Sequence, residues 1–208
     1  MEDVLEVYHR PYDAKRPQVN MDEQPVQLTK ETRAPLPTQP GKPARFDYEY
    51  ERNGTANLFM FVEPLKGFRF VNVTARRTAV DWAYQIRELV DVHYPDAEKI
   101  VLVMDNLNTH KTGSLYEAFP AEEAWRLAQK LEIHYTPKHG SWLNIAEIEL
   151  AALTKQCLDR RIPDRKTLRS EVIDWKKQRN ENQKGVDWRF TTTNARIKLK
   201  RLYPRIES

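Results

Sequence analysis

The chain has 208 residues, of which 40% are hydrophobic and 31% are charged, so it can bury one sizeable core beneath a highly polar surface. Its 34 Lys and Arg residues and 30 Asp and Glu residues give a net charge of +4, which permits nucleic-acid binding without requiring it. The sequence contains no apolar run of membrane-spanning length and no signal-peptide pattern, and the single cysteine, Cys157, excludes an intramolecular disulfide and a cysteine-rich zinc site. We therefore expect a soluble, cytoplasmic protein without membrane contact.

The first part of the chain predicts a linker, a strand and a surface segment. Residues 1–16 combine a short helical pattern with many charges, and we interpret them as the tail of something larger. Residues 19–28 partly alternate apolar and polar positions, which predicts a strand that carries Asp22 and whose regular pairing ends close to Pro25. Residues 31–45 are rich in proline and basic side chains, which is typical of an extended segment that follows the surface.

A β-hairpin is predicted next in the chain. Residues 46–52 and 55–63 flank Asn53-Gly54, which is a strong sequence signal for a tight turn between two strands. Residues 69–74 predict a further strand after a turn at Gly67. The sequence therefore predicts three consecutive antiparallel strands, of which the one from Phe46 to Arg52 is expected at the periphery, outside the central sheet.

The second half of the chain alternates helical and strand patterns. A short run of branched apolar residues from Ile100 to Met104 is typical of a strand buried on both faces, and a shorter strand is predicted from Ile133 to Tyr135. Apolar positions recur at helical spacing over four ranges: residues 79–93, 121–131, 145–158 and 166–182. These patterns predict an α/β fold with a mixed sheet and helices on both of its faces.

Three carboxylates are candidates for a metal-dependent active site. Asp105 directly follows the buried strand, where a rigidly held carboxylate suits a hard divalent cation. If the strand of Asp22 lies beside it, the two carboxylates meet at one edge of the sheet, and Glu147, in the first turn of the following helix, faces that edge. Three convergent carboxylates would hold two Mg²⁺ or Mn²⁺ ions about 3.5–4 Å apart and act on a phosphodiester. Glu149 lies about 200° around the helix from Glu147, so both cannot point at one site.

Each of these residues also has a purely structural interpretation. Asp105-Asn106 is compatible with a turn that ends the strand, and Asp22-Glu23 with a solvated strand end. Asn144 and Glu147 have the spacing of a helix capping box. The remaining loop residues are compatible with ordinary exposed or packing side chains: His110, His139 and Trp142.

Taken together, Asp22-Glu23, the element Asp105-Asn-x-x-x-His110 and the run from Tyr135 to Glu147 resemble the catalytic domain of DDE transposases. The most similar branch is the mariner-like superfamily, specifically its bacterial insertion-sequence transposases. The resemblance implies a ribonuclease-H-like fold with a five-stranded sheet, in which Asp22, Asp105 and Glu147 are the catalytic residues and metal ligands of two Mg²⁺ or Mn²⁺ ions. It also implies strand cleavage and strand transfer at transposon ends, by attack of water and then of a 3′ hydroxyl.

The resemblance also divides the chain into three parts. Residues 17–165 correspond to the ribonuclease-H-like catalytic domain, and residues 166–208 to a C-terminal helix and basic tail packed on it. Residues 1–16 correspond to a linker or tail of an N-terminal DNA-binding region that is expected to be missing from this chain.

DNA is the partner that the resemblance implies, in the form of transposon terminal inverted repeats and target DNA, with a homodimer as the active complex at the bacterial nucleoid. Contacts to DNA are assigned to polar and aromatic residues near the carboxylates: Asn106, His110, Lys111, Lys138, His139 and Trp142. Two alternatives stay open. One is a ribonuclease-H-like metal-dependent nuclease that cuts without joining, and the other is a truncated, non-catalytic remnant that binds DNA or dimerises.

Overall fold

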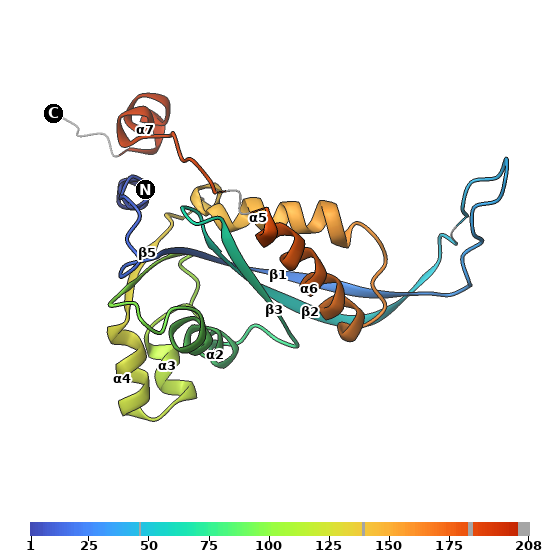
Figure 1. Ribbon diagram of the computed structural model, residues 1–208, viewed down its shortest axis with the longest axis horizontal. Helices are drawn as coiled ribbons and strands as arrows, with labels where there is room; N and C mark the ends of the chain where they lie inside the picture. The colour runs from blue at the N-terminus through green and yellow to red at the C-terminus, as the bar shows by residue number, and fades with distance from the viewer. Residues whose placement is uncertain (46, 139, 183–184, 204–208) are drawn as a thin grey trace.

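The computed structural model describes residues 1–45, 47–138, 140–182 and 185–203, in which helices lie on both sides of a five-stranded sheet (Figure 1). The strands are β1 (Gln18–Glu31), β2 (Tyr50–Glu63), β3 (Phe68–Thr74), β4 (Ile100–Met104) and β5 (Leu131–Tyr135). The α-helices are α1 (Glu2–Tyr8), α2 (Ala79–Glu88), α3 (Gly113–Ala118), α4 (Ala121–Gln129), α5 (Ile145–Leu153), α6 (Arg165–Glu181) and α7 (Thr192–Lys198). Short π-helical or 3-10 segments are η1 (Leu89–His93), η2 (Ser141–Leu143), η3 (Thr154–Leu158) and η4 (Lys200–Leu202).

The strand order across the sheet is β3-β2-β1-β4-β5. The strands β1, β2 and β3 are antiparallel neighbours, whereas β4 runs parallel to β1, and β5 runs parallel to β4. Every residue of β4 is buried, as its unbroken apolar run predicts for a central parallel strand. The predicted mixed five-stranded sheet of an α/β fold is therefore confirmed.

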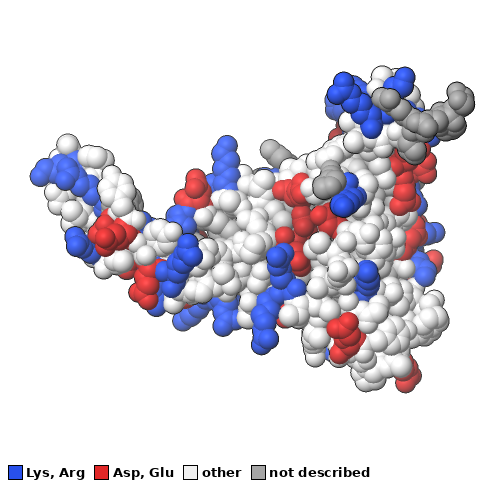
Figure 2. Space-filling view, turned by 180° about the vertical axis from the view of Figure 1, so that it is seen from behind, with Lys and Arg blue, Asp and Glu red and all other residues white. Residues whose placement is uncertain are grey.

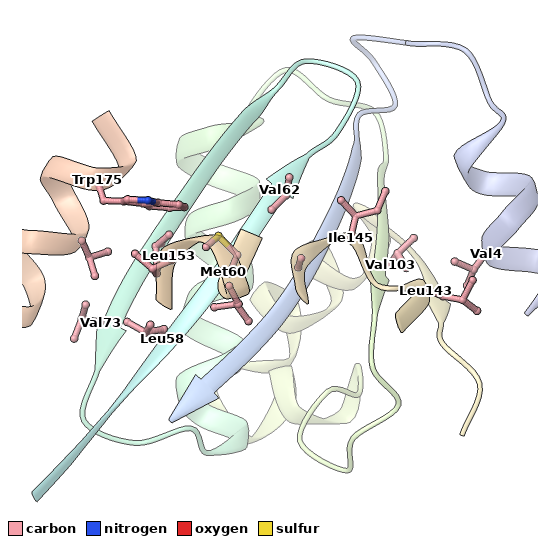
Figure 3. Close-up of a cluster of buried hydrophobic side chains, with 14 of the residues drawn as sticks. Val4, Leu58, Met60, Val62, Val73, Val103, Leu143, Ile145, Leu153 and Trp175 are labelled. Carbon is pink, nitrogen blue, oxygen red and sulfur yellow. The ribbon is translucent and has the colours of Figure 1, made fainter. Parts of the chain in front are cut away.

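Alternating side chains of the strands enter two separate hydrophobic cores. Val103 of β4 belongs to the core covered by α1, α5 and α6, whereas Leu102 belongs to the core covered by α2, α3 and α4. Figure 3 shows the first core, where Met60 of β2 is gathered with Ile145 of α5 and Trp175 of α6. Water is excluded from β4 because each of its side chains meets apolar neighbours on whichever face it points to.

The predicted hairpin at Asn53-Gly54 is wrong. β2 runs through both residues and pairs with β1 on either side of them. The pairing register shifts at this point and Gly54 has a φ of +84°, which is the geometry of a β-bulge. A bulge of this glycine type and a tight hairpin turn both use a residue with positive φ, so the local Asn-Gly signal does not distinguish them.

The actual connection between β1 and β2 is a long arm. Residues 32–49 link the two strands, with isolated bridges between Leu36 and Arg45 and between Gln39 and Lys42. The described residues of this arm are mostly exposed, and the arm projects beyond the body of the molecule (Figure 1). The proline-rich segment therefore does not follow the surface, because it has few apolar side chains to pack there. Phe46, the first residue of the predicted peripheral strand, lies outside the described residues.

Regular pairing continues past Pro25, contrary to the prediction. β1 extends to Glu31 and pairs Pro25 with Asn57 of β2. β4 pairs with β1 only from Gln18 to Met21, so Pro25 borders no strand on that side and its missing N–H interrupts no ladder there.

The four predicted helices are confirmed, whereas α3 and α7 were not predicted. In α1, the side chains of Val4, Leu5 and Val7 are fully buried in the first core, so this part of the predicted linker belongs to the packed fold. That residues 1–16 lead from a further domain stays a prediction. None of the helices in the described ranges is long and apolar enough to cross a membrane.

Replacing Gly54 by alanine is expected to lower the free energy of unfolding by about 1 kcal/mol, because an L side chain disfavours a positive φ even where the added Cβ meets open space. Gly113→Ala is the matched control, since its Cβ also meets open space but the residue lies in α3 without a positive φ. It is expected to stabilise the protein slightly. Urea denaturation compares the two variants, and equal midpoints would contradict the bulge.

Candidate active site

Asp22 and Asp105 occupy equivalent positions on two neighbouring parallel strands. The last pair in the register between β1 and β4 joins Met21 to Met104, so each aspartate is the next residue along the chain, Asp22 within β1 and Asp105 directly after β4. Met21 and Met104 both belong to the core under α2, α3 and α4. Because successive side chains point to opposite faces, both aspartates point to the face where α5 lies.

The start of α5 is attached to the strand that carries Asp22. Asn144 is the N-cap residue of α5, and its Nδ2 donates a hydrogen bond to the carbonyl oxygen of Met21 at 2.9 Å. The Oδ1 of Asn144 accepts a hydrogen bond from the N–H of Ala146 at 3.2 Å, which caps the helix. This double role brings the first turn of α5, which contains Glu147, next to the part of β1 that carries Asp22.

The predicted capping box is not formed, because Oδ1 of Asn144 accepts from the N–H of the second helical residue, Ala146, and not from that of Glu147. The N–H of Asn144 donates to the carbonyl oxygen of Ser141 at 2.7 Å and not to the side chain of Glu147. The carboxylate of Glu147, which is half-buried, therefore does not cap the helix in the described structure.

The other two carboxylates act electrostatically on Asp22. Burial, together with the negative charges of Asp105 and Glu147, raises the pKa of Asp22 from 3.8 to about 7. The N–H of Glu23 donates to Oδ1 of Asp22 at 2.8 Å and partly opposes this rise. Asp22 is therefore only partly ionised at neutral pH unless a cation compensates its charge.

The carboxylate oxygens of Asp22, Asp105 and Glu147 are suitable ligands for a hard divalent cation, but in this structure they do not surround a common metal position. Carboxylate oxygens are ligands that Mg²⁺ and Mn²⁺ prefer, and the pKa of Asp22 is raised by burial and, to a smaller extent, by the neighbouring carboxylates. Within the described ranges, no three Asp, Glu, His or Cys side chains approach closely enough to hold an ion together. Metal binding by Asp22, Asp105 and Glu147 therefore requires their side chains to close around the ion.

Asp105 has a hydrogen-bond donor that was not identified from the sequence, Thr136. Oγ1 of Thr136 donates to Oδ1 of Asp105 at 2.7 Å, and the N–H of Thr136 donates to the carbonyl oxygen of Met104 at 3.0 Å. Thr136 is buried and follows β5 as Asp105 follows β4. The sequence signal that could have identified Thr136 is a hydroxyl side chain directly after a predicted strand.

His110 is a buried residue that shapes the loop after β4. Its ring is 0% exposed, with Nδ1 3.0 Å from the carbonyl oxygen of Asp105 and Nε2 3.4 Å from Oε2 of Glu23. The ring stacks on Trp82, and Glu23 also pairs with Arg77 at 3.2 Å. The predicted DNA contact by His110 is wrong for this structure, because the ring is enclosed by these groups.

Glu149 has a role different from that of Glu147, as the helix geometry predicts. Its buried carboxylate pairs with Arg69 of β3 at 3.1 Å and with Arg179 of α6 at 2.9 Å. These ion pairs join three elements, and they compensate a charge whose burial would otherwise be costly. Glu149 therefore contributes to packing and not to the group around Asp22.

Four residues that were predicted to contact DNA are exposed: Asn106, Lys111, Lys138 and Trp142. Trp142 is 42% exposed, and its ring makes a T-shaped contact with the ring of Phe190 with 5.9 Å between centroids, so part of the ring packs and part stays accessible. His139 lies outside the described residues. Figure 2 shows Lys and Arg side chains on the projecting arm and along the edge of the body, intermixed with Asp and Glu. DNA contact by the four exposed residues stays a prediction.

Comparison with known proteins supports the arrangement as a whole. A family model described as DDE superfamily endonuclease matches residues 17–169. The fold is similar to the crystal structure of the Mos1 mariner paired end complex with Mn, with a TM-score of 0.57 and 16% identity, covering 84% of this chain and 52% of that chain. This likeness confirms the predicted ribonuclease-H-like fold.

Two further structures are similar. The Mos1 strand transfer complex has a TM-score of 0.59 and 14% identity, covering 87% of this chain and 53% of that chain. The simian T-cell lymphotropic virus intasome in complex with PP2A regulatory subunit B56 gamma has a TM-score of 0.50 and 12% identity, covering 93% of this chain and 59% of that chain. The present chain thus spans about half the length of the Mos1 chains. No curated protein matches it.

Replacing Asn144 by alanine is expected to lower the free energy of unfolding by about 1–3 kcal/mol, because it removes both the helix cap and the bond to Met21. Asn144→Ser keeps a capping hydroxyl without the amide donor, so it is expected to recover part of that loss. Guanidinium denaturation measures both variants. A serine variant as unstable as the alanine variant would show that the cap contributes nothing.

The substitution Asp22→Asn is expected to stabilise the metal-free protein, and by more at high pH than at low pH. The unfolded chain ionises Asp22 near pH 3.8 and the folded chain near pH 7, so the stability contributed by this group is fully present below pH 3.8 and is lost as the pH rises to about 7. Asp22→Asn removes that loss, with a gain of at most about 4 kcal/mol at pH 8 and less at pH 5. Urea unfolding in EDTA at both pH values measures the gain, and equal gains would contradict the raised pKa.

Proposed function

The chain belongs to the DDE superfamily endonuclease family, and we propose that it is the catalytic domain of a transposase that cleaves and joins DNA strands with divalent metal ions. The observation that carries the proposal is the placement of three carboxylates. Asp22, within β1, and Asp105, directly after β4, both follow the last register pair of these neighbouring parallel strands on the face covered by α5, and Glu147 lies in the first turn of that helix. The effect of Asp105 and Glu147 on the pKa of Asp22 supports a shared site.

Asp22, Asp105 and Glu147 are the proposed ligands of two ions, Mg²⁺ or Mn²⁺. When bound, such ions activate the attacking oxygen and stabilise the leaving oxygen of a phosphodiester. The chain's own contribution is to hold the ligands: Thr136 orients the carboxylate of Asp105, and Asn144 holds the start of α5 against β1. Because ligand orientation strongly affects metal affinity, both residues are expected to be functional.

Substrates and partners follow by analogy with the Mos1 structures, which are a paired end complex with Mn and a strand transfer complex. Transposon terminal inverted repeats and target DNA are the proposed partners, with water and then a 3′ hydroxyl as the attacking groups and a homodimer as the active form. A bacterial insertion sequence is the proposed source, with action at the nucleoid. Residues 1–16 would then connect a DNA-binding region to the catalytic domain.

Contact with DNA is proposed for the exposed residues on the loops around the carboxylates: Asn106, Lys111, Lys138 and Trp142. Lysine side chains there neutralise phosphates, and an exposed indole ring provides a surface for stacking on an unpaired base. Binding is therefore expected to weaken as the salt concentration rises.

Two other functions differ in what they produce. A ribonuclease-H-like nuclease would cut DNA without joining it, and a non-catalytic remnant would bind DNA or dimerise without cutting. The presence of all three carboxylates at one end of the sheet favours an enzyme over a remnant. Joined products separate the transposase from the nuclease.

Asp105→Asn is expected to reduce Mg²⁺-dependent cleavage of labelled transposon-end DNA by about 10- to 100-fold, because it removes the charge of a metal ligand while keeping the side chain's shape. Glu117→Gln, at an exposed position on α3, is the matched control and is expected to act like the unaltered chain. Gel electrophoresis resolves cleaved from joined strands. Unchanged cleavage by Asp105→Asn would contradict both enzymatic functions, and cleavage without joining by the unaltered chain would favour the nuclease.

A further inference from the structure

A second bridge joins the Asp22 strand to the start of α5, and it passes through the N-terminal helix. The hydroxyl group of Tyr8, the last residue of α1, accepts a hydrogen bond from Nδ2 of Asn20 at 2.5 Å. The same hydroxyl donates to the carbonyl oxygen of Leu143 at 2.6 Å. Asn20 precedes Asp22 on the same face of β1, and Leu143 precedes Asn144, the N-cap of α5.

This bridge lies beside the hydrogen bond between Asn144 and Met21. Together, the two bridges connect residues 20 and 21 of β1 to residues 143 and 144. A single hydrogen bond leaves rotation about its axis free, whereas two neighbouring bridges fix both the distance and the orientation of α5 relative to β1. Asp22 and Glu147 are the first carboxylates beyond these attachments on each element.

The bridge is polar although the core around it is apolar. Tyr8 is 7% exposed and Asn20 is 0% exposed, and Oδ1 of Asn20 has no hydrogen-bond partner among the described residues. A buried polar group without a hydrogen-bond partner destabilises the fold, so an apolar residue at position 20 would serve stability better. The pair of polar residues is therefore better explained by positioning than by stability.

The chain holds Tyr8 firmly and keeps its hydroxyl protonated. Burial raises the pKa of Tyr8, and the charge of Asp105 adds to the rise, so the hydroxyl keeps the proton that it donates to Leu143. The apolar side chains of α1 are buried in the first core, and Glu2 of α1 pairs with Arg196 of α7 at 2.7 Å.

We propose that Tyr8 is a positioning residue for the metal site, whose hydroxyl fixes the start of α5 against β1 and thereby sets the separation between Glu147 and Asp22. This inference rests on the proposed function, because it takes both carboxylates as metal ligands. The described side chains do not yet surround an ion, so metal affinity depends on how α5 is held against the strand. Helix α1 consequently connects the segment ahead of residue 17 to the metal site.

Binding of Mn²⁺ to the full 208-residue chain, measured from the electron paramagnetic resonance signal of free Mn²⁺, tests this proposal. Tyr8→Phe keeps the ring and removes the hydroxyl, and it is expected to weaken Mn²⁺ binding about tenfold, as for other residues that orient metal ligands. Tyr12→Phe removes a hydroxyl from a ring that is 54% exposed and is expected to bind Mn²⁺ like the unaltered chain.

Asn20→Val removes the other end of the bridge. It distinguishes positioning from a purely structural role, because the two roles predict different combinations of Mn²⁺ affinity and melting temperature. It is expected to weaken Mn²⁺ binding while the melting temperature stays the same or rises, because a β-branched apolar side chain in a strand replaces a buried amide whose oxygen has no partner among the described residues. A structural role predicts instead that affinity and melting temperature fall together. If Tyr8→Phe and Asn20→Val both bind Mn²⁺ as tightly as Tyr12→Phe, the positioning role is overturned.

Asp22→Asn in the same titration separates this proposal from the proposed function. If Asp22→Asn loses Mn²⁺ binding while Tyr8→Phe retains it, only the positioning role fails. If Asp22→Asn retains Mn²⁺ binding, the assignment of the metal site fails, and the positioning role fails with it.

Discussion

Burial of Asp22 beside two further carboxylates is the constraint on which the arrangement of this molecule depends. Asp22, Asp105 and Glu147 come from β1, from the end of β4 and from α5, and the charges of the latter two act on Asp22 where it is partly buried. Like charges move apart unless the backbone holds them. Parallel pairing of β1 with β4, and the hydrogen bond from Asn144 to β1, oppose that separation.

The acidic residues have two different roles here, and the hydrogen-bond or ion-pair partner of each carboxylate decides its role. Glu149 and Glu23 are compensated by arginine side chains, which makes them parts of the packed structure. Asp22 and Asp105 instead accept hydrogen bonds from neutral donors, a backbone N–H and the hydroxyl of Thr136. A neutral donor orients a carboxylate without cancelling its charge, and that leaves the charge to attract a cation.

Elements whose pattern is local were predicted well. The strand β4 follows from an unbroken apolar run, and α2, α5 and α6 follow from apolar positions at helical spacing. The errors at Asn53-Gly54 and Pro25 arose where the neighbouring strand decides the outcome. A positive φ serves a turn or a bulge equally well, and a missing N–H matters only if a strand lies beside it.

The amino-acid sequence alone identified the acidic residues of the proposed site, and the helical geometry that separates Glu147 from Glu149. Only the tertiary structure decided that Asp22 lies beside Asp105, that Thr136 donates to Asp105, and that Tyr8 connects α1 to the start of α5. The physical reason is the distance along the chain over which each kind of feature is determined. Periodicity records which face of its own element a residue occupies, whereas strand register and hydrogen bonds between distant segments depend on how separate elements pack together.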